Sequence, residues 1–347
     1  MRLADFDFDL PEQLIAQEPP AERGDSRLLV VDRTAGSWRD AHIADLPSLL
    51  AAGDVLAVNN SRVVPARLLG HRDPSGGAVE CLLLRQLDDE TWEALIHPGQ
   101  KMKTGTRACF GEGESALLVE VLAMHTFGRR TIRMWSPTGH EVSEIVDRIG
   151  HMPLPPYINR DDREADRDRY QTVYASRRGS VAAPTAGLHF TDDLLRRLEA
   201  RGVERAEVTL HVGYGTFEPV RTEVVEAHRL HPETFSIDDT AAQTITSARR
   251  DGRRVVCVGT TTTRTLEAVA AEHGGVMPAS GEASLYIYPG FRFQVAGGLL
   301  TNFHLPKSSL LLLVCAFAGT ELTLAAYRHA IAERYRFYSY GDAMLII

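Results

Sequence analysis

Short apolar runs alternate with amphipathic segments of helical length over most of the chain. Runs at residues 26–32, 54–60 and 253–259 are typical of buried strands, and we also expect strands at 178–184 and 283–289. After residue 151 strand-like and helix-like segments follow one another to the C-terminus. This alternation predicts a layered α/β domain.

Residues 66–132 have a different pattern. Several short strand-like runs are separated by Gly, Pro and Asp turns, without a helix-length periodic segment among the first five. This is typical of a small antiparallel barrel or sandwich. The predicted fold is therefore a layered α/β domain made of residues 1–65 and 151–347, with an all-β barrel-like domain inserted at 66–150.

Three of the predicted strands are followed by polar turns that lead into a helix. These turns are PTAGLH at 184–189, TTTTR at 260–264 and TNFH at 301–304. Ligands of open α/β sheets bind beyond the carboxyl ends of the strands, where helix N-termini favour anions. One such turn alone is more typical of ordinary capping, but three of them favour a binding site if their strands are parallel neighbours.

Two other segments carry clustered polar residues. The mixed-charge run at 159–170 is typical of a solvated, mobile loop, which could also meet a large substrate through its arginines. His228 and His231 are spaced like metal ligands, but Pro232 interrupts the helix that would place them on one face. We therefore expect no metal site.

Composition places the protein among soluble globular proteins. The 347 residues are 44% apolar and carry a net charge of −8, which argues against broad, non-specific nucleic-acid binding but leaves room for a local arginine face. The acidic N-terminus has no apolar signal core and no apolar run is long enough to cross a membrane, so we expect a cytoplasmic protein without a membrane partner. Four separated cysteines form no CxxC pair and fit a reducing compartment: Cys81, Cys109, Cys257 and Cys315.

Several longer motifs, in order along the chain, resemble one family. They include FDFDLPEQLIAQEP, DVLAVNNSRVVPARLLG, GHMPLPPYINR, GSVAAPTAGLHFT, VGTTTTRTLE, LYIYPGF and LLTNFHLPKSSLLLLVCAFAG. The family is the S-adenosylmethionine:tRNA ribosyltransferase-isomerase of queuosine biosynthesis. This sequence departs from the family pattern at Pro232, Ala283 and Ser284, so the resemblance implies no role for these positions.

The resemblance implies a reaction and its substrates. The ribosyl part of S-adenosylmethionine is moved onto 7-aminomethyl-7-deazaguanine at the wobble position of tRNA, which gives epoxyqueuosine-tRNA and releases adenine and methionine. It implies no metal or organic cofactor besides the co-substrate S-adenosylmethionine. The sequence leaves the oligomeric state open, although we favour a monomer.

Residue type and position suggest roles in this reaction. We predict His189 and His304 as acid/base groups, with His211 as a third candidate, because histidines suit proton transfer near neutral pH. Arg264 at a helix start suits the methionine carboxylate. The remaining candidates are Thr185, Thr260, Thr261 and Asn302 for the ribose and adenine, Tyr288 or Phe217 for stacking, and Arg62 and Arg67 for tRNA phosphates.

Two other functions remain open at this level. One is an S-adenosylmethionine-dependent RNA methyltransferase, which would form S-adenosylhomocysteine but for which the chain has no Gly-rich loop after its first strand. The other is a non-catalytic tRNA-binding protein, which would bind tRNA without consuming S-adenosylmethionine.

Overall fold

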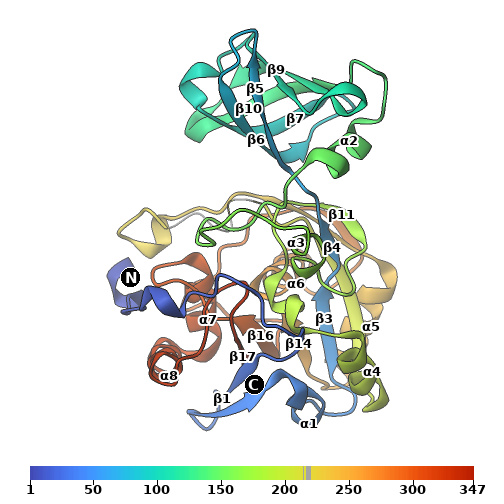
Figure 1. Ribbon diagram of the computed structural model, residues 1–347. Helices are drawn as coiled ribbons and strands as arrows, with labels where there is room; N and C mark the ends of the chain where they lie inside the picture. Colours follow the sequence, from blue (N-terminus) through green and yellow to red (C-terminus); the bar gives the residue numbers. More distant parts are fainter. Residues whose placement is uncertain (214, 216–219) are drawn as a thin grey trace.

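The computed structural model describes residues 1–213, 215 and 220–347 of the chain. They form a β-barrel that stands on one end of a larger α/β unit (Figure 1). The candidate residue Phe217 lies outside the described residues.

A nine-stranded mixed sheet forms the centre of the α/β unit. Its strands are β1 (Arg27–Asp32), β2 (Ser37–His42), β3 (Val55–Asn59), β12 (Glu204–Leu210), β13 (Glu233–Ile237), β14 (Val255–Val258), β15 (Ala279–Ala283), β16 (Gly298–Asn302) and β17 (Ala343–Ile346). Their order is β15-β13-β12-β3-β14-β16-β17-β1-β2, and the four strands from β12 to β16 in this order are parallel.

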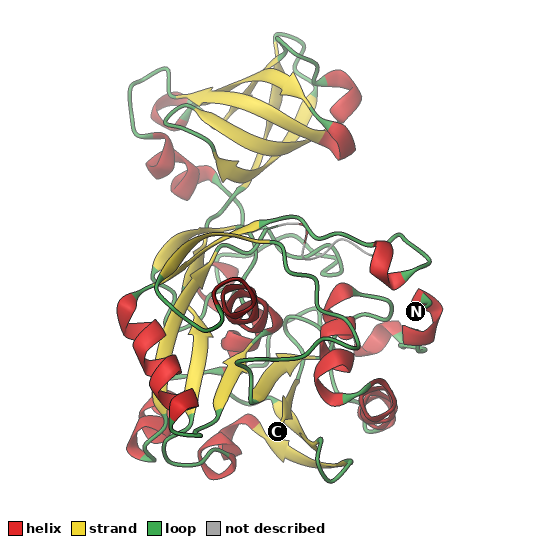
Figure 2. Cartoon of the chain, turned by 180° about the vertical axis from the view of Figure 1, so that it is seen from behind, coloured by secondary structure: helices red, strands yellow, loops and turns green. Residues whose placement is uncertain are grey.

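Helices cover both faces of this sheet (Figure 2). They are α1 (Leu46–Leu49), α4 (Asp192–Ala200), α5 (Asp239–Arg250), α6 (Thr260–His273), α7 (Ser309–Ala318) and α8 (Thr320–Ala332). Successive strand residues point to opposite faces, so Ala57 and Cys257 pack with α5 to α8, while Leu56 and Val256 pack with α1 and α4. The three layers explain why the central strands are apolar throughout rather than alternating.

The barrel closes from six antiparallel strands in the order β10-β7-β6-β5-β8-β9. These are β5 (Arg67–Asp73), β6 (Ala78–Gln86), β7 (Thr91–His97), β8 (Arg107–Phe110), β9 (Leu117–Met124) and β10 (Arg129–Trp135). Inward residues such as Leu68, Phe110 and Ile132 fill its interior, and α2 (Val142–Ile149) adds Ile145 and Val146. The predicted fold class is confirmed, whereas the domain boundaries at 66 and 150 stay a prediction.

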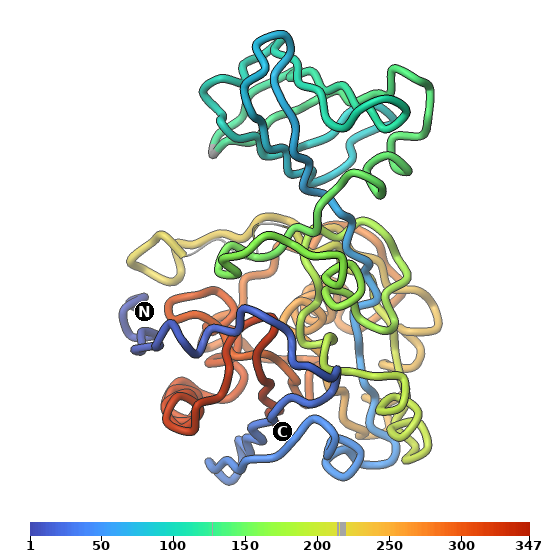
Figure 3. Tube along the Cα trace, in the orientation of Figure 1, coloured from blue at the N-terminus to red at the C-terminus, as the bar shows by residue number. Residues whose placement is uncertain are grey.

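Two adjacent chain segments join the barrel to the α/β unit, as the trace shows (Figure 3). The strands β4 (Ser61–Val63) and β11 (Arg177–Ser180) pair in parallel beside this junction. Arg67 and His151 exchange two backbone hydrogen bonds there, of 3.2 and 2.8 Å. The outgoing and returning segments are thereby fixed to each other.

The strands expected at 178–184 and 283–289 do not extend over all of these residues in the structure. β11 ends at Ser180 because the N–H groups of Val181 and Ala182 both donate to the carbonyl of Val212, which is not a ladder pattern. The segment 285–288 lies outside any strand, and its apolar side chains pack into the core beside the sheet instead. This segment has the apolar pattern of a strand because it is buried, although it does not pair with a neighbouring strand.

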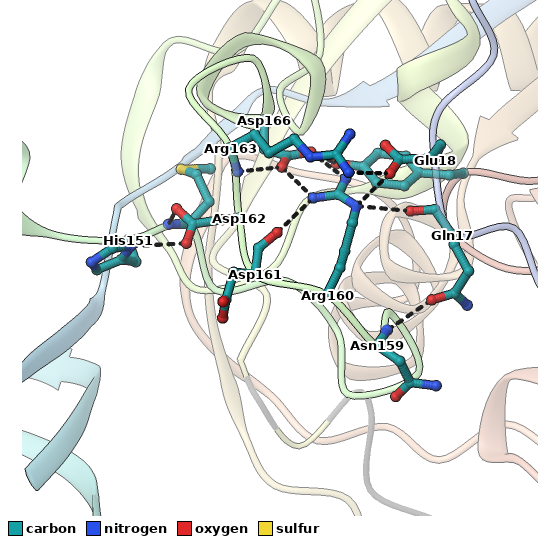
Figure 4. A network of polar contacts seen from close by, with 11 residues as sticks. Gln17, Glu18, His151, Asn159, Arg160, Asp161, Asp162, Arg163 and Asp166 are labelled. Atoms are coloured by element: carbon teal, nitrogen blue, oxygen red, sulfur yellow. Dashed lines mark hydrogen bonds and ion pairs between the residues drawn. The ribbon is translucent and has the colours of Figure 1, made fainter.

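The run at 159–170 differs in part from the predicted solvated loop, because Arg160 and Asp166 are paired in it, whereas residues such as Glu164 are exposed (Figure 4). Arg160 donates to both carboxylate oxygens of the buried Asp166, at 2.7 and 2.9 Å, and to the carbonyl of Gln17. Arg167 donates to the carbonyls of Asp147 and Gly150. These arginines hold the segment and the barrel linker in place.

No single helix within the described ranges is long and apolar enough to cross a membrane, and α7 and α8 meet that test only as a pair bent by 114°.

Candidate functional site

A cavity of about 280 Å³ lies at the carboxyl ends of the parallel neighbours β14 and β16. We call it the strand-end cavity. Residues from all three predicted turns line it, namely Thr185, Thr260, Thr261, Asn302 and His304. The turn at 184–189 reaches it although β11 lies outside the large sheet, because the hydrogen bonds to Val212 carry the chain across the end of β12.

The threonines at the start of α6 divide into two kinds. Thr262 and Thr263 donate their hydroxyls to the carbonyls of Val258 and Gly259, four residues earlier, at 2.7 and 3.0 Å. Within the described chain, the hydroxyls of Thr260 and Thr261 have no such partner, and both residues line the cavity. The helix start therefore offers a ligand two hydroxyls, together with the N–H groups that a first helical turn leaves unbonded.

Asn302 is held by a chain of buried hydrogen bonds. Its Nδ2 donates to His189 Nε2 at 3.1 Å and to the carbonyl of Tyr338 at 3.0 Å. Because an amide nitrogen only donates, His189 carries its proton on Nδ1, which donates to Ser26 Oγ at 3.0 Å. Asn302 Oδ1 has no partner among the described residues, so it is the acceptor available at the cavity wall.

His304 lines the cavity itself, whereas His189 lies behind Asn302 with both ring nitrogens bonded. His304 Nε2 lies 2.8 Å from Thr301 Oγ1, which leaves Nδ1 for a ligand. Burial lowers the pKa of His304 to about 3, and burial with the charges of Arg336 and Arg23 lowers the pKa of His189 to about 4. Both rings are therefore uncharged at neutral pH.

A second cavity of about 440 Å³ lies between the barrel and the α/β unit, and we call it the interface pocket. Its polar lining residues include Arg85, Glu93 and Arg129 from the barrel and Arg178, His211, His231, Glu233, Arg264 and Tyr286 from the α/β unit. It shares the wall residues Val212 and Leu310 with the strand-end cavity. The two cavities are therefore neighbours.

Arg264 and His211 thus lie in the interface pocket and not in the strand-end cavity. Arg264 forms a buried ion pair with Glu233, whose other oxygen accepts the N–H of Gly213 at 2.9 Å. Burial lowers the pKa of His211. The predicted role of Arg264 toward the methionine carboxylate stays a prediction, since Glu233 already occupies part of its guanidinium.

Three other candidates lie away from both cavities. Tyr288 packs beside Tyr286, with ring centroids 5.1 Å apart, and does not line either one. Arg62 is exposed on β4 near the junction. Arg67 pairs with Glu80 at 2.9 Å and lines a third cavity, of about 740 Å³, under the barrel. Their predicted roles also stay predictions.

The C-terminal tail is also part of the strand-end cavity, which no sequence pattern predicted. Tyr338 and Ser339 line it, and Tyr157 stacks on Tyr338 and bonds Ser339 through its hydroxyl. Tyr338 has a φ of 73°, which is rare for a residue other than glycine and is often found at functional sites. Such a conformation leaves no mark in the sequence.

The described part of the chain contains no group of three or more His, Cys, Asp or Glu side chains that could hold a metal ion.

Comparison with known proteins gives one consistent result. The model of the queuosine biosynthesis protein family matches residues 3–346. Proteins of Symbiobacterium thermophilum and Solibacter usitatus, both named S-adenosylmethionine:tRNA ribosyltransferase-isomerase, are 51% and 52% identical to this chain, and each alignment covers 100% of both chains.

A solved structure is similar as well. The crystal structure of an S-adenosylmethionine tRNA ribosyltransferase from Thermotoga maritima matches 99% of this chain and 100% of its own, with 34% identity and a TM-score of 0.56. The fold, the length and the motifs thus agree, and this chain belongs to the queuosine biosynthesis family, whose curated members are named S-adenosylmethionine:tRNA ribosyltransferase-isomerase.

Proposed function

We propose that this protein transfers and isomerises the ribosyl part of S-adenosylmethionine onto 7-aminomethyl-7-deazaguanine at the tRNA wobble position. Epoxyqueuosine-tRNA forms, and adenine and methionine leave. The proposal depends above all on the strand-end cavity, where groups from three distant turns supply uncharged hydrogen-bonding partners in an otherwise mostly apolar wall. Such a lining suits a nucleoside.

The electrostatics of the cavity support a cationic nucleoside as the ligand. S-adenosylmethionine carries a positive sulfonium, and two protonated histidines beside it would repel that charge. Since burial keeps the pKa of His189 and His304 far below 7, neither ring is charged at neutral pH. Lys307 also lines the cavity, but its ammonium is paired with Asp7 at 2.5 Å.

We assign the groups by what each can donate or accept. Thr185, Thr260 and Thr261 suit the ribose hydroxyls, and Asn302 Oδ1 suits an amino group such as that of adenine. His304, through Nδ1, is the group best placed to accept a proton from the substrate. His189 acts on this site through Asn302.

The test combines the protein, S-adenosylmethionine and a synthetic anticodon stem-loop that carries the modified wobble base. Mass spectrometry should find the ribosylated stem-loop together with free adenine and methionine. Formation of S-adenosylhomocysteine with a methylated stem-loop would indicate a methyltransferase instead. Binding of the stem-loop without consumption of S-adenosylmethionine would indicate a non-catalytic protein.

A matched pair of variants tests whether this activity takes place in the strand-end cavity. Thr261→Val removes a hydroxyl that lines the cavity, whereas Thr262→Val removes one that is bonded inside the helix. One hydrogen bond contributes about 0.5–1.5 kcal/mol, so Thr261→Val should raise the KM for S-adenosylmethionine about 2- to 13-fold. Thr262→Val should leave that KM unchanged, and equal effects of the two would contradict this placement.

A further inference from the structure

The interface pocket has the size and position of a second ligand site. Its walls come from the barrel and from the α/β unit, so it exists only where the two units meet. Val212 and Leu310 separate it from the strand-end cavity and belong to the walls of both. A ligand in the pocket would therefore lie next to a ligand in the cavity.

Two polar atoms of the pocket residues have no hydrogen-bond partner among the described residues. Tyr286 Oη and His211 Nδ1 are buried and make no hydrogen bond to any described residue. Burial raises the pKa of Tyr286 to about 12 and lowers that of His211, so both groups are uncharged at neutral pH. A buried polar group without a partner costs about 1–3 kcal/mol, which a ligand with uncharged donors and acceptors would recover.

The backbone makes room for the His211 ring. Gly179, which also lines the pocket, has a φ of 140°, and a Cβ added there would lie 2.8 Å from His211 Cε1. Any larger residue at this position would displace the imidazole. The ring is thus held at the wall of the pocket by a close backbone approach.

The pocket also has positive charge contributed by both units. Arg85 and Arg129 come from the barrel and Arg178 from β11, with side chains that are 51%, 26% and 41% exposed. Their carboxylate partners Glu93, Glu282 and Asp147 are 21%, 51% and 47% exposed. Such surface pairs contribute only about 0–1 kcal/mol, so phosphate groups can replace the carboxylates.

These features suit a ligand that has a flat, uncharged polar part and a negatively charged backbone. We propose that the interface pocket binds a single unstacked base of an RNA loop, with Tyr286 and His211 contacting its polar edge and the three arginines contacting the flanking phosphates. This inference rests on the proposed function. It adds a separate site for the RNA base, adjacent to the site for S-adenosylmethionine.

The experiment removes one hydroxyl from the pocket. Tyr286→Phe should weaken binding of the stem-loop that carries the aminomethyl-deazaguanine about 5- to 160-fold, because a polar group of the base loses its buried partner. Binding of S-adenosylmethionine alone, measured by calorimetry, should not change. Binding of the free modified nucleobase should weaken by a similar factor, which separates the base contact from the phosphate contacts.

Tyr174→Phe is the matched control. The Tyr174 hydroxyl is also buried and unpartnered among the described residues, but it packs with Phe190 in the core away from the pocket. This variant should bind the stem-loop like the wild type. The inference is overturned if Tyr286→Phe binds the stem-loop as Tyr174→Phe does, or if it weakens S-adenosylmethionine binding instead.

The experiment can distinguish a failure of the pocket assignment from a failure of the proposed function. If the wild type consumes no S-adenosylmethionine, the proposed function fails, while the difference between Tyr286→Phe and Tyr174→Phe in stem-loop binding still decides the role of the pocket. If the wild type turns over but the two variants bind RNA equally, only the assignment of the pocket fails.

Discussion

The strand-end cavity and the interface pocket share two wall residues but differ in construction. The cavity is made by turns of one α/β unit, and its hydrogen-bonding groups are uncharged except for the ammonium of Lys307, which is paired with Asp7. The pocket is made where two units meet, and it contains a buried ion pair and several exposed arginines. The first arrangement suits a small molecule held by shape and hydrogen bonds, whereas the second suits a segment of a large polyanion.

This difference also separates rigid from adjustable parts. The groups in the cavity are fixed by backbone geometry and by buried bonds such as Asn302–His189. The pocket depends on the placement of the barrel, which is held by the Arg67–His151 backbone bonds and by surface pairs such as Arg85–Glu282. Variants in the cavity should therefore change the binding and the reaction of S-adenosylmethionine, and variants in the pocket should change RNA binding and stability.

The largest effect should come from His304, which lines the cavity, and a smaller one from His189, which lies behind Asn302. His304→Gln should lower the rate of adenine release about 100- to 10,000-fold, the usual range for a lost acid/base group. His189→Asn should lower it only about tenfold, because His189 acts by orienting Asn302 through one hydrogen bond. Single-turnover adenine release measured by chromatography distinguishes these values.

His329→Asn serves as the control for both histidine variants. His329 pairs with Asp40 near the surface and lines neither cavity, so this variant should release adenine at the wild-type rate. If His189→Asn is as slow as His304→Gln, His189 takes part in the chemistry directly, and the distinction between the two histidines is lost.

The next effect concerns the buried ion pair of the interface pocket. Arg264→Met should destabilise the protein by about 3–5 kcal/mol, because it removes the guanidinium that pairs with the buried carboxylate of Glu233. The double variant Arg264→Met/Glu233→Gln should regain most of this loss in urea denaturation. If Arg264→Met is stable but has a higher KM for S-adenosylmethionine, Arg264 is instead a partner of the methionine carboxylate, as its sequence position suggests.

Much of the cavity could be predicted from the sequence because its groups belong to local turns. Thr260 and Thr261 directly follow a buried strand, and Asn302 and His304 flank the end of another. Two parallel neighbouring strands necessarily bring such turns to one edge of the sheet. For these four residues only the pairing of β14 with β16 had to be supplied by the fold, whereas Thr185 reaches the cavity through the backbone bonds of its segment to Val212.

The remaining features depend on contacts between distant segments. Arg264 lies one helical turn after Thr260, yet its partner Glu233 comes from another strand, 31 residues away. His189 is the last residue of the turn at 184–189, and the amide of Asn302 that separates it from the cavity lies 113 residues away. The contribution of Tyr338 depends on its backbone conformation. No pattern of residue types predicts the Arg264–Glu233 pair, the position of His189 behind Asn302 or the conformation of Tyr338.

The smallest effect should appear in the pH dependence of stability. The pKa of His304 is about 3 in the folded protein and near 6.5 in the unfolded chain, so below pH 6.5 the unfolded state binds a proton that the folded state does not. The free energy of unfolding should therefore fall as the pH falls, by up to about 1.4 kcal/mol per pH unit from this residue, until the folded pKa is reached. His304→Gln should remove that part of the slope between about pH 6 and 4.5, as measured by urea denaturation.

His211→Asn should change the slope less, because the pocket leaves His211 partly exposed and its pKa is lowered only by incomplete burial. Equal slopes for the two variants would mean that the cavity and the pocket exclude water to the same degree, which contradicts the difference between them.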